Sequence, residues 1–377
     1  MRNTLFAFLL IFFACQSQKP QESTKTTFYV GTYTQKEGHV DGKGDGIYKM
    51  TFDPATLALT VTDTISGMIN PSFLALSNDQ QSLYAVNEIG PGSEAIGLFE
   101  AYNIRKGDFG KKMFSNSTQG YAPCHIALSP NGKLAIVSNY AGGMVSVIPL
   151  SVQADSGVQT IRLPAVKKSS PRQDDSHPHS AIFSVDGKMV YVADLGTDRI
   201  MAFQVDETNQ KLAPASSPFF ELPEGSGPRH ISLSADGKVL YALCELNNTI
   251  AVLDISSPVD IHLLQSISTL PADFQGKSYG ADIHLSKDGK MLYASNRGHN
   301  SIAIFKVKLD GKLESKGEVG AEGKTPRNFH LTNDGRWMLV ANQDTGNIAL
   351  FDLKKEELPV FVKSIQVNTP VSIVEVK

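Results

Sequence analysis

The chain has 377 residues, of which 19% are charged, and its formal net charge at pH 7 is -3. A chain so close to neutral lacks the basic excess that binds nucleic acid or an anionic membrane surface, so we expect neither as its main partner. Its length fits two ordinary domains or one repeat array, and its 31 Gly and 19 Pro favour an all-β chain with many turns.

The first residues have the pattern of an export signal. A single arginine precedes a short apolar run, which ends just before Cys15. A run this short, with a positive charge before it and a small residue after it, is typical of a secretory signal. Because it ends on cysteine, the box at 12–15 resembles a bacterial lipoprotein signal, with Phe where Leu is usual. The alternative is a plain secretory signal whose cysteine is incidental.

This pattern predicts three parts of the chain. Residues 1–15 form the signal, with Cys15 as the lipidated first residue of the mature protein. Residues 16–27 form a flexible tether, and residues 28–377 form the folded domain. We therefore expect an exported lipoprotein that faces the periplasm and meets the membrane only through its lipid.

One segment pattern then recurs along the chain, Pro-x-x-x-x-x-Ser/Thr followed by a tight turn and a second apolar strand. It begins at Pro71, Pro123, Pro178, Pro228 and Pro326, and at Gly280 in one copy without the proline. Each copy continues into a third apolar run, at 96–99 in the first copy, and a more variable fourth. Four strands in about 50 residues are typical of a propeller blade.

Six copies are complete, and the seventh is divided between the two ends of the chain. Residues 369–374 match a first strand, and the runs 28–33, 46–52 and 59–65 supply the other three. Strands from both termini would pair the last open edges of the ring. We therefore predict an all-β fold, a seven-bladed β-propeller of four-stranded antiparallel blades. A pair of β-sandwiches, the alternative, would not require the matching strand at the end.

The copy at 227–245 shows how polar residues gather at one end of each hairpin. The register expected from its turn puts Arg229 opposite Cys244 and Pro228 opposite Glu245. A guanidinium and a carboxylate are then neighbours at the open end of the hairpin.

The first strand of every blade starts, and the second ends, at the same mouth of the central channel. The ionisable residues at these positions are His125, His179, Arg229, His230, Asp282, Arg327, Glu88, Glu245 and Arg297. The alternative for His125 and His230 is a hydrogen bond to backbone between blades, and for Arg327 an ion pair with Asp282. His284 and His330 lie further along their strands, and we expect them to be structural.

Metal binding and disulfide formation are both disfavoured. His177 and His179 could present two imidazoles to a metal. No carboxylate or Cys lies at a spacing from them that is typical of a metal site, so we expect no metal and no cofactor. Cys124 and Cys244 fall in copies that are not adjacent, which predicts two small buried residues without a disulfide.

Three motifs carry a family resemblance: His-Pro-His-Ser at 177–180, Gly-Pro-Arg-His at 227–230 and Tyr-Val-Gly-Thr-Tyr-Thr at 29–34. Together with the repeated first strands, they resemble the seven-bladed propeller lactonase family over residues 28–377. That family includes propeller-type 6-phosphogluconolactonases and carboxy-muconate lactonizing enzymes. The resemblance implies an enzyme that hydrolyses a sugar-acid lactone at the channel mouth, in carbohydrate metabolism.

The resemblance also implies a site of one His, two Arg and one Glu. The catalytic residues would be Glu245, Arg229, Arg297 and His179. Substrate-binding residues would be His177, His125, His230 and Arg327, with His177 a second fit for the catalytic His.

Lactone hydrolysis needs a base and groups that hold an oxyanion. Glu245 is the candidate base, although two neighbouring arginines would lower its pKa unless they instead hold the phosphate or carboxylate of the substrate. His179 would serve as base or as acid for the leaving oxygen.

We expect a monomer whose partner is a small-molecule lactone. Export is at odds with a phosphorylated substrate, because phosphorylated gluconolactone is a cytosolic intermediate. The alternatives are a lactone-forming cycloisomerase of the same family and a non-enzymatic periplasmic propeller that binds a sugar or a protein.

Overall fold

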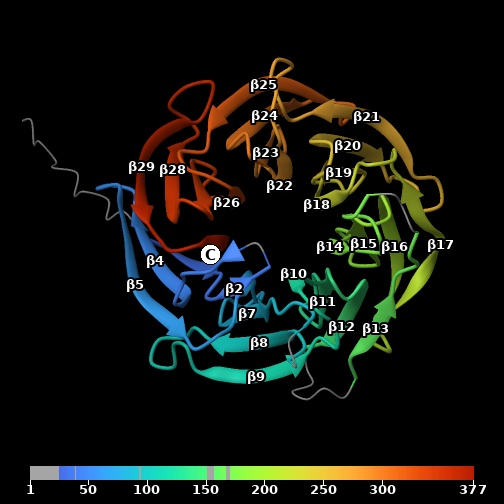
Figure 1. Cartoon of the computed structure of the whole chain (residues 1–377), viewed down its shortest axis with the longest axis horizontal. Coiled ribbons are helices and arrows are strands. Elements are labelled where there is room, and N and C mark those ends of the chain that lie inside the picture. The colour runs from blue at the N-terminus through green and yellow to red at the C-terminus, as the bar shows by residue number, and fades with distance from the viewer. Residues whose placement is uncertain (1–24, 39, 93–94, 151–156, 167–169) are drawn as a thin grey trace, which may run out of the picture.

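The structure is a computed structural model that describes residues 25–377 except 39, 93–94, 151–156 and 167–169. The described residues contain no helix, and their strands form seven four-stranded antiparallel sheets arranged in a ring (Figure 1). This confirms the predicted seven-bladed propeller. Cys15 and the rest of the expected signal lie outside the described residues.

The first six blades each use four consecutive strands, beginning with the innermost. Blade 1 contains β6 (Pro71–Leu76), β7 (Ser82–Asn87), β8 (Leu98–Asn103) and β9 (Lys112–Ser117). Blade 2 contains β10 (Pro123–Leu128), β11 (Leu134–Asn139), β12 (Met144–Pro149) and β13 (Gln159–Arg162). Blade 3 contains β14 (Pro178–Phe183), β15 (Met189–Asp194), β16 (Arg199–Asp206) and β17 (Lys211–Glu221).

The same order continues through the next three blades. Blade 4 contains β18 (Pro228–Leu233), β19 (Val239–Cys244), β20 (Thr249–Asp254) and β21 (His262–Ser268). Blade 5 contains β22 (Tyr279–Leu285), β23 (Met291–Arg297), β24 (Ser301–Val307) and β25 (Leu313–Gly320). Blade 6 contains β26 (Pro326–Leu331), β27 (Trp337–Asn342), β28 (Asn347–Asp352) and β29 (Val360–Gln366).

Blade 7 closes the ring with strands from both ends of the chain. It contains, in order, β30 (Pro370–Glu375), β1 (Thr26–Thr32), β4 (Gly46–Asp53) and β5 (Ala58–Ser66). The pairing of Val30 with Ile373 lies at the centre of the β30–β1 ladder, as the divided seventh repeat predicted. A small hairpin, β2 (Lys36–Glu37) and β3 (Val40–Asp41), is inserted between β1 and β4.

The hydrophobic core lies between adjacent blades because each inner strand is buried on both faces. Leu240 and Ala242 of β19 pack against blade 3, whereas Tyr241 and Leu243 of the same strand pack against blade 5. This alternation follows from the two-residue period of a strand. Cys244 packs with the first pair, and both it and Cys124 are free and buried, as expected.

The hairpin register near the mouth differs from the predicted one. In β18, Pro228 pairs with Cys244 and His230 pairs with Leu243, so Arg229 is an extra residue in a β-bulge. The predicted pairings of Arg229 with Cys244 and of Pro228 with Glu245 are therefore wrong by one residue. The same bulge follows the proline that begins the repeated segment, which we call the marker proline, in β6, β10, β14 and β26. In blade 1, the third strand begins at Leu98 and not at Ile96.

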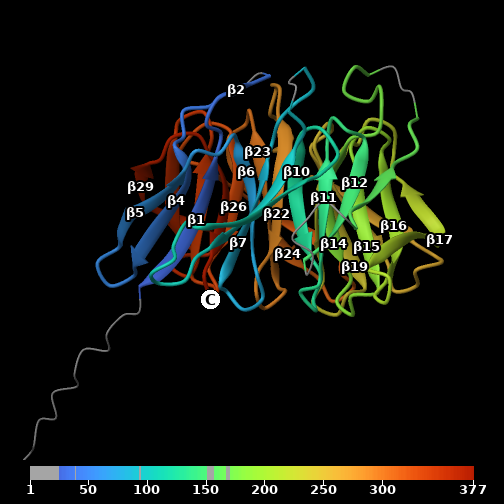
Figure 2. The same ribbon diagram turned by 90° about the horizontal axis from the view of Figure 1, so that it is seen from below.

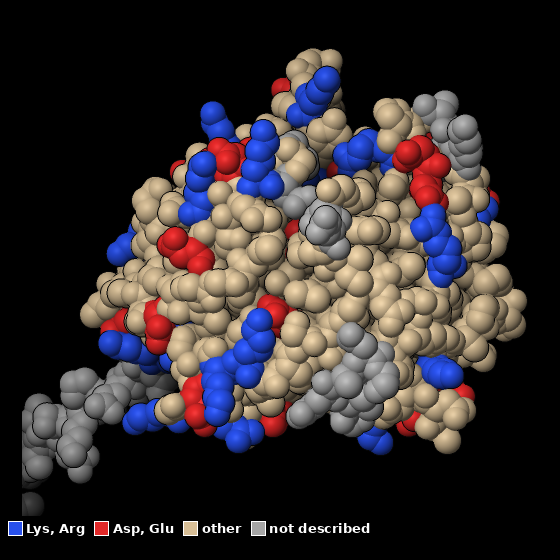
Figure 3. All heavy atoms as spheres, turned by 60° about the horizontal axis from the view of Figure 1, so that its bottom comes forward, with Lys and Arg blue, Asp and Glu red and all other residues tan. Residues whose placement is uncertain are grey.

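The two faces of the ring differ in what they carry. We call the face at which the innermost strands begin the mouth face, and the opposite one the entry face. The β2–β3 hairpin lies at the mouth face, whereas β30 ends at the entry face (Figure 2). On the side of the ring seen in Figure 3, acidic and basic side chains are interspersed, without a large patch of one sign. No described part of the chain forms a helix long and apolar enough to cross a bilayer.

Candidate functional site

Glu245 lies at the centre of the site, directly after β19, where its backbone N–H donates to the Gly227 carbonyl at 2.7 Å. Its side chain is only 3% exposed. Three guanidinium groups contact the carboxylate: Arg229 Nε at 3.1 Å and Arg297 Nη2 at 2.8 Å from Oε2, and Arg172 Nη2 at 2.8 Å from Oε1. Burial alone would raise the pKa of Glu245, but the three cations outweigh it and lower this pKa to about 2.

Two of these arginines are fixed by the backbone of the next blade. Arg229 Nη1 donates to the Ala281 carbonyl, and Arg297 Nη2 donates to the Gly280 carbonyl at 3.1 Å. Gly280 takes the place of the marker proline because β19 runs very close to it. A Cβ at this position would lie 3.0 Å from the Leu243 side chain. Burial lowers the pKa of Arg229 to about 9, so its guanidinium stays protonated at neutral pH.

The third arginine, Arg172, was not predicted from the sequence. It lies in the segment between β13 and β14, and its Nε and Nη2 donate to the Tyr140 hydroxyl at 3.3 and 3.2 Å. The Tyr140 ring in turn stacks on His177, with ring centres 4.6 Å apart. The neighbouring Gln173 anchors the segment, because its amide donates to the Leu195 carbonyl at 2.9 Å. The segment leads directly into β14, so it reaches the mouth face, where that strand begins.

Three histidines line the channel next to this cluster. His179 occupies the bulge of β14, with Nδ1 3.7 Å from the Cys124 sulfur and its ring 5.4 Å from that of Tyr140. His230 lies with its ring 5.4 Å from His179 and 5.5 Å from His125. Burial, reinforced by Arg229, lowers the pKa of His179 well below its usual value. At neutral pH this imidazole is therefore uncharged.

Asp282 is hydrogen-bonded to two histidines, one of which, His230, belongs to the group that lines the channel. It accepts hydrogen bonds from His230 Nδ1 at 2.8 Å, His284 Nε2 at 2.9 Å and Asn328 Nδ2 at 2.6 Å. Burial opposes ionisation of Asp282, but His284 and His230 outweigh it and keep the pKa of this carboxyl well below its usual value. His230 is thus bound to a buried carboxylate and not to backbone, the alternative that the sequence left open.

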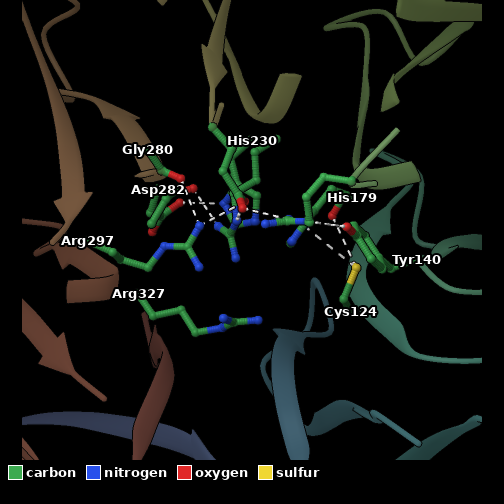
Figure 4. A network of polar contacts seen from close by, with 12 residues as sticks. Cys124, Tyr140, His179, His230, Gly280, Asp282, Arg297 and Arg327 are labelled. Atoms are coloured by element: carbon green, nitrogen blue, oxygen red, sulfur yellow. Dashed lines mark hydrogen bonds and ion pairs between the residues drawn. The ribbon is translucent and has the colours of Figure 1, made fainter. Parts of the chain in front are cut away.

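Arg327 does not pair with Asp282, which the sequence had left as an alternative. Its Nη2 donates to the Tyr33 hydroxyl at 3.0 Å, and its guanidinium lies 5.4 Å from the centre of that ring. In Figure 4, Arg297, Arg327, His230 and His179 point toward one another from different blades. His330 contacts Glu375 at 3.0 Å on the entry face, away from this group, consistent with a structural role.

The site carries an excess of positive charge. Four guanidiniums converge on the mouth, from Arg172, Arg229, Arg297 and Arg327. Among the described residues, Glu245 is the one carboxylate within ion-pair distance of any of them. Such a cluster is suited to hold a phosphate or carboxylate by charge-assisted hydrogen bonds. No group of three or more His, Cys, Asp or Glu in the described part of the chain could hold a metal ion.

Comparisons with known proteins agree with this architecture. Residues 27–375 match the family described as "Lactonase, 7-bladed beta-propeller". The chain is 32% identical to a 6-phosphogluconolactonase of Bacillus subtilis over 313 residues, which is 81% of this chain and 85% of that protein. It is 31% identical over 317 residues to a 6-phosphogluconolactonase of Formosa agariphila, covering 80% of this chain and 85% of the relative. A periplasmic gluconolactonase of Pseudomonas aeruginosa has a similar structure, with a TM-score of 0.83 and 29% identity over 94% of this chain and 99% of that one.

Proposed function

Because the chain belongs to the seven-bladed β-propeller lactonase family, we propose that it hydrolyses a sugar-acid lactone at the mouth of the central channel, as a 6-phosphogluconolactonase does. The observation that carries this proposal is the convergence of four guanidiniums, the Glu245 carboxylate and the neutral His179 at one mouth. The excess positive charge there favours a lactone that bears an acidic group.

The proposed reaction adds water across the lactone ester. Glu245 takes a proton from water as the water oxygen bonds to the carbonyl carbon, and the π electrons of the carbonyl move to its oxygen. The guanidiniums of Arg297 and Arg327 stabilise that oxyanion. The intermediate collapses, the bond from the carbonyl carbon to the ring oxygen breaks, and the ring oxygen receives the proton through His179. The new carboxylic acid releases its own proton to solvent.

Arg229 and the remaining histidines have supporting roles in this proposal. Arg229 is fully buried and keeps the Glu245 carboxylate in place, while His230 and His125 form the channel wall beside His179. His177 lies behind Tyr140 and supports that ring. His177 is therefore less suited than His179 to meet a substrate at the mouth.

The test is turnover of three lactones by the purified protein: 6-phosphoglucono-δ-lactone, glucono-δ-lactone and galactono-γ-lactone. Each rate is corrected for spontaneous hydrolysis. We expect hydrolysis above the spontaneous rate, with the acidic lactone preferred. If no lactone is hydrolysed while a sugar or sugar acid still binds at the mouth, the propeller is a binding module and the proposal fails.

We also propose that the protein is exported and carries a lipid on Cys15. Support comes from the signal-like sequence before Cys15 and from the name of the periplasmic gluconolactonase with a similar structure. In a bacterial host, Cys15→Ser should move the protein from the membrane fraction to the soluble periplasmic fraction, because the apolar run is then only a cleavable signal. If the protein is found in the cytosol with its N-terminus intact, the export proposal is wrong.

A further inference from the structure

The three arginines around Glu245 are held in different ways. Arg229 and Arg297 extend from strands of the blades, and each donates to a backbone carbonyl of β22. Their side chains are 2% and 13% exposed, respectively. These two guanidiniums are therefore fixed parts of the channel wall.

Arg172 is the exception. Its side chain is 44% exposed, and within the described part of the chain its guanidinium donates only to side-chain oxygens, those of Tyr140 and Glu245. Among the described residues, its Nη1 has no hydrogen-bond partner, so part of the guanidinium remains available to a ligand. The backbone beside it is fixed, because Gln173 is buried and its amide also donates to Asp198 at 2.7 Å. The guanidinium can therefore change partner without moving the segment.

We propose that Arg172 recognises the acidic group of the substrate and, on binding it, releases the Oε1 atom of Glu245. This inference rests on the proposed lactonase function and adds to it the residue that selects acidic lactones. A phosphate or carboxylate in the mouth competes with Glu245 for the same guanidinium, and a bidentate contact is the geometry that arginine favours.

The exchange has a consequence for the chemistry. With three guanidiniums in contact, Glu245 has little affinity for a proton and is a weak base. When Arg172 turns to the substrate, Glu245 keeps two of its three cations and gains an anion nearby, and both changes raise its proton affinity. An acidic substrate thereby strengthens the base that activates the attacking water, so selectivity should appear in kcat as well as in KM.

The experiment compares 6-phosphoglucono-δ-lactone with uncharged glucono-δ-lactone in the wild type and in Arg172→Gln. We expect the ratio of the two kcat/KM values, acidic over neutral, to fall about 10- to 100-fold, the size of one charge-assisted hydrogen bond. Turnover of the neutral lactone should rise in the variant, because Glu245 has permanently lost one cation. Arg172→Lys should restore only part of the ratio, since lysine does not make the bidentate contact.

Two further variants separate recognition from general damage. Tyr140→Phe keeps the ring that stacks on His177 but removes the hydroxyl that orients Arg172, so the ratio should fall by a smaller factor. Arg105→Gln removes the same charge from an exposed position in the β8–β9 turn at the entry face, and it should leave the ratio at the wild-type value. Thermal unfolding of each variant checks that it folds.

An equal fall for both lactones, or an unchanged ratio, would refute the role of Arg172 while leaving the lactonase proposal intact. If the wild type hydrolyses neither lactone, the proposed function fails, and calorimetric binding of 6-phosphogluconate and of the uncharged sugar alcohol glucitol decides the recognition role alone. In that case, Arg172→Gln should weaken the binding of 6-phosphogluconate about tenfold more than the binding of glucitol. An equal effect on both would overturn the inference.

Discussion

Replacing Glu245 with glutamine tests both the chemistry and the energetics of the site. The variant keeps the size of the side chain but removes the one negative charge that contacts three guanidiniums. Arg229 is 2% exposed and cannot turn to water. Removing one partner of a buried ion pair typically costs about 3–5 kcal/mol, because the other charge is left uncompensated.

The pKa of Glu245 gives a second route to the same quantity. A value of about 2, against 4.5 for an unperturbed glutamate, corresponds to about 3 kcal/mol of stability at neutral pH. Since the pKa is lower in the folded protein, this stability is present above pH 4.5 and is lost as the pH falls toward 2.

The assay is urea unfolding of wild type and Glu245→Gln at several pH values, together with lactone turnover. At pH 7 the variant should be less stable by about 3 kcal/mol, and about half of that difference should be gone by pH 3. Turnover should fall about 100-fold, as expected for the loss of a general base.

The matched control is Glu314→Gln, which removes a half-exposed carboxylate paired with Lys316 at 3.2 Å. Its unfolding free energy should stay at the wild-type value, because an ion pair exposed to solvent contributes little. Equal stability of wild type and Glu245→Gln at pH 7 would refute the buried ion cluster, and equal turnover would refute the base assignment.

Three other changes test the ring and the site. Deleting residues 370–377 removes β30 and exposes the edge of β1 that paired with it, so thermal unfolding should shift to lower temperature for the whole propeller; an unchanged midpoint would contradict the role of β30 in closure. Asp282→Asn should cost about 3 kcal/mol at pH 6, because a buried acceptor of His230 and His284 loses its charge. Asp282 raises the pKa of His284 despite burial, so this cost should shrink as the pH rises above 6.5 in urea titrations, and a cost that grew would contradict the pairing. Arg297→Ala should lower kcat/KM for acidic and neutral lactones alike in steady-state assays, because both form the oxyanion, and unchanged values would argue against this role of Arg297.

The repeat pattern was enough to predict the ring and its closure. Each blade repeats the same hairpin, so the ends of its inner strands had to meet at one mouth. This is why Arg229, Glu245 and Arg297 could be placed together from their positions in the repeat, and the structure brings them into contact. The register itself was wrong by one residue at Arg229, because a β-bulge adds a residue that an alternating pattern does not reveal.

Two other features of the site could not be predicted from the repeat. Arg172 belongs to a segment with no counterpart in other blades, so no comparison of copies could place its side chain on Glu245. Asp282 does follow the repeat, but the repeat does not show which side chains lie within hydrogen-bond distance of its carboxylate. Two histidines and Asn328 surround it, and Arg327 is left to Tyr33.

The place where the chain enters the ring has a consequence for how the molecule would sit in the cell. β1 begins at the entry face, because Phe28 pairs with Glu375 at the far end of β30 from the mouth. With a lipid on Cys15, the residues between the anchor and β1 span at most about 35 Å when fully extended. The bilayer would then lie beneath the entry face, and the mouth would open toward the aqueous space. If it were anchored in this way, the enzyme would meet dissolved metabolites on the side of the ring that faces away from the membrane.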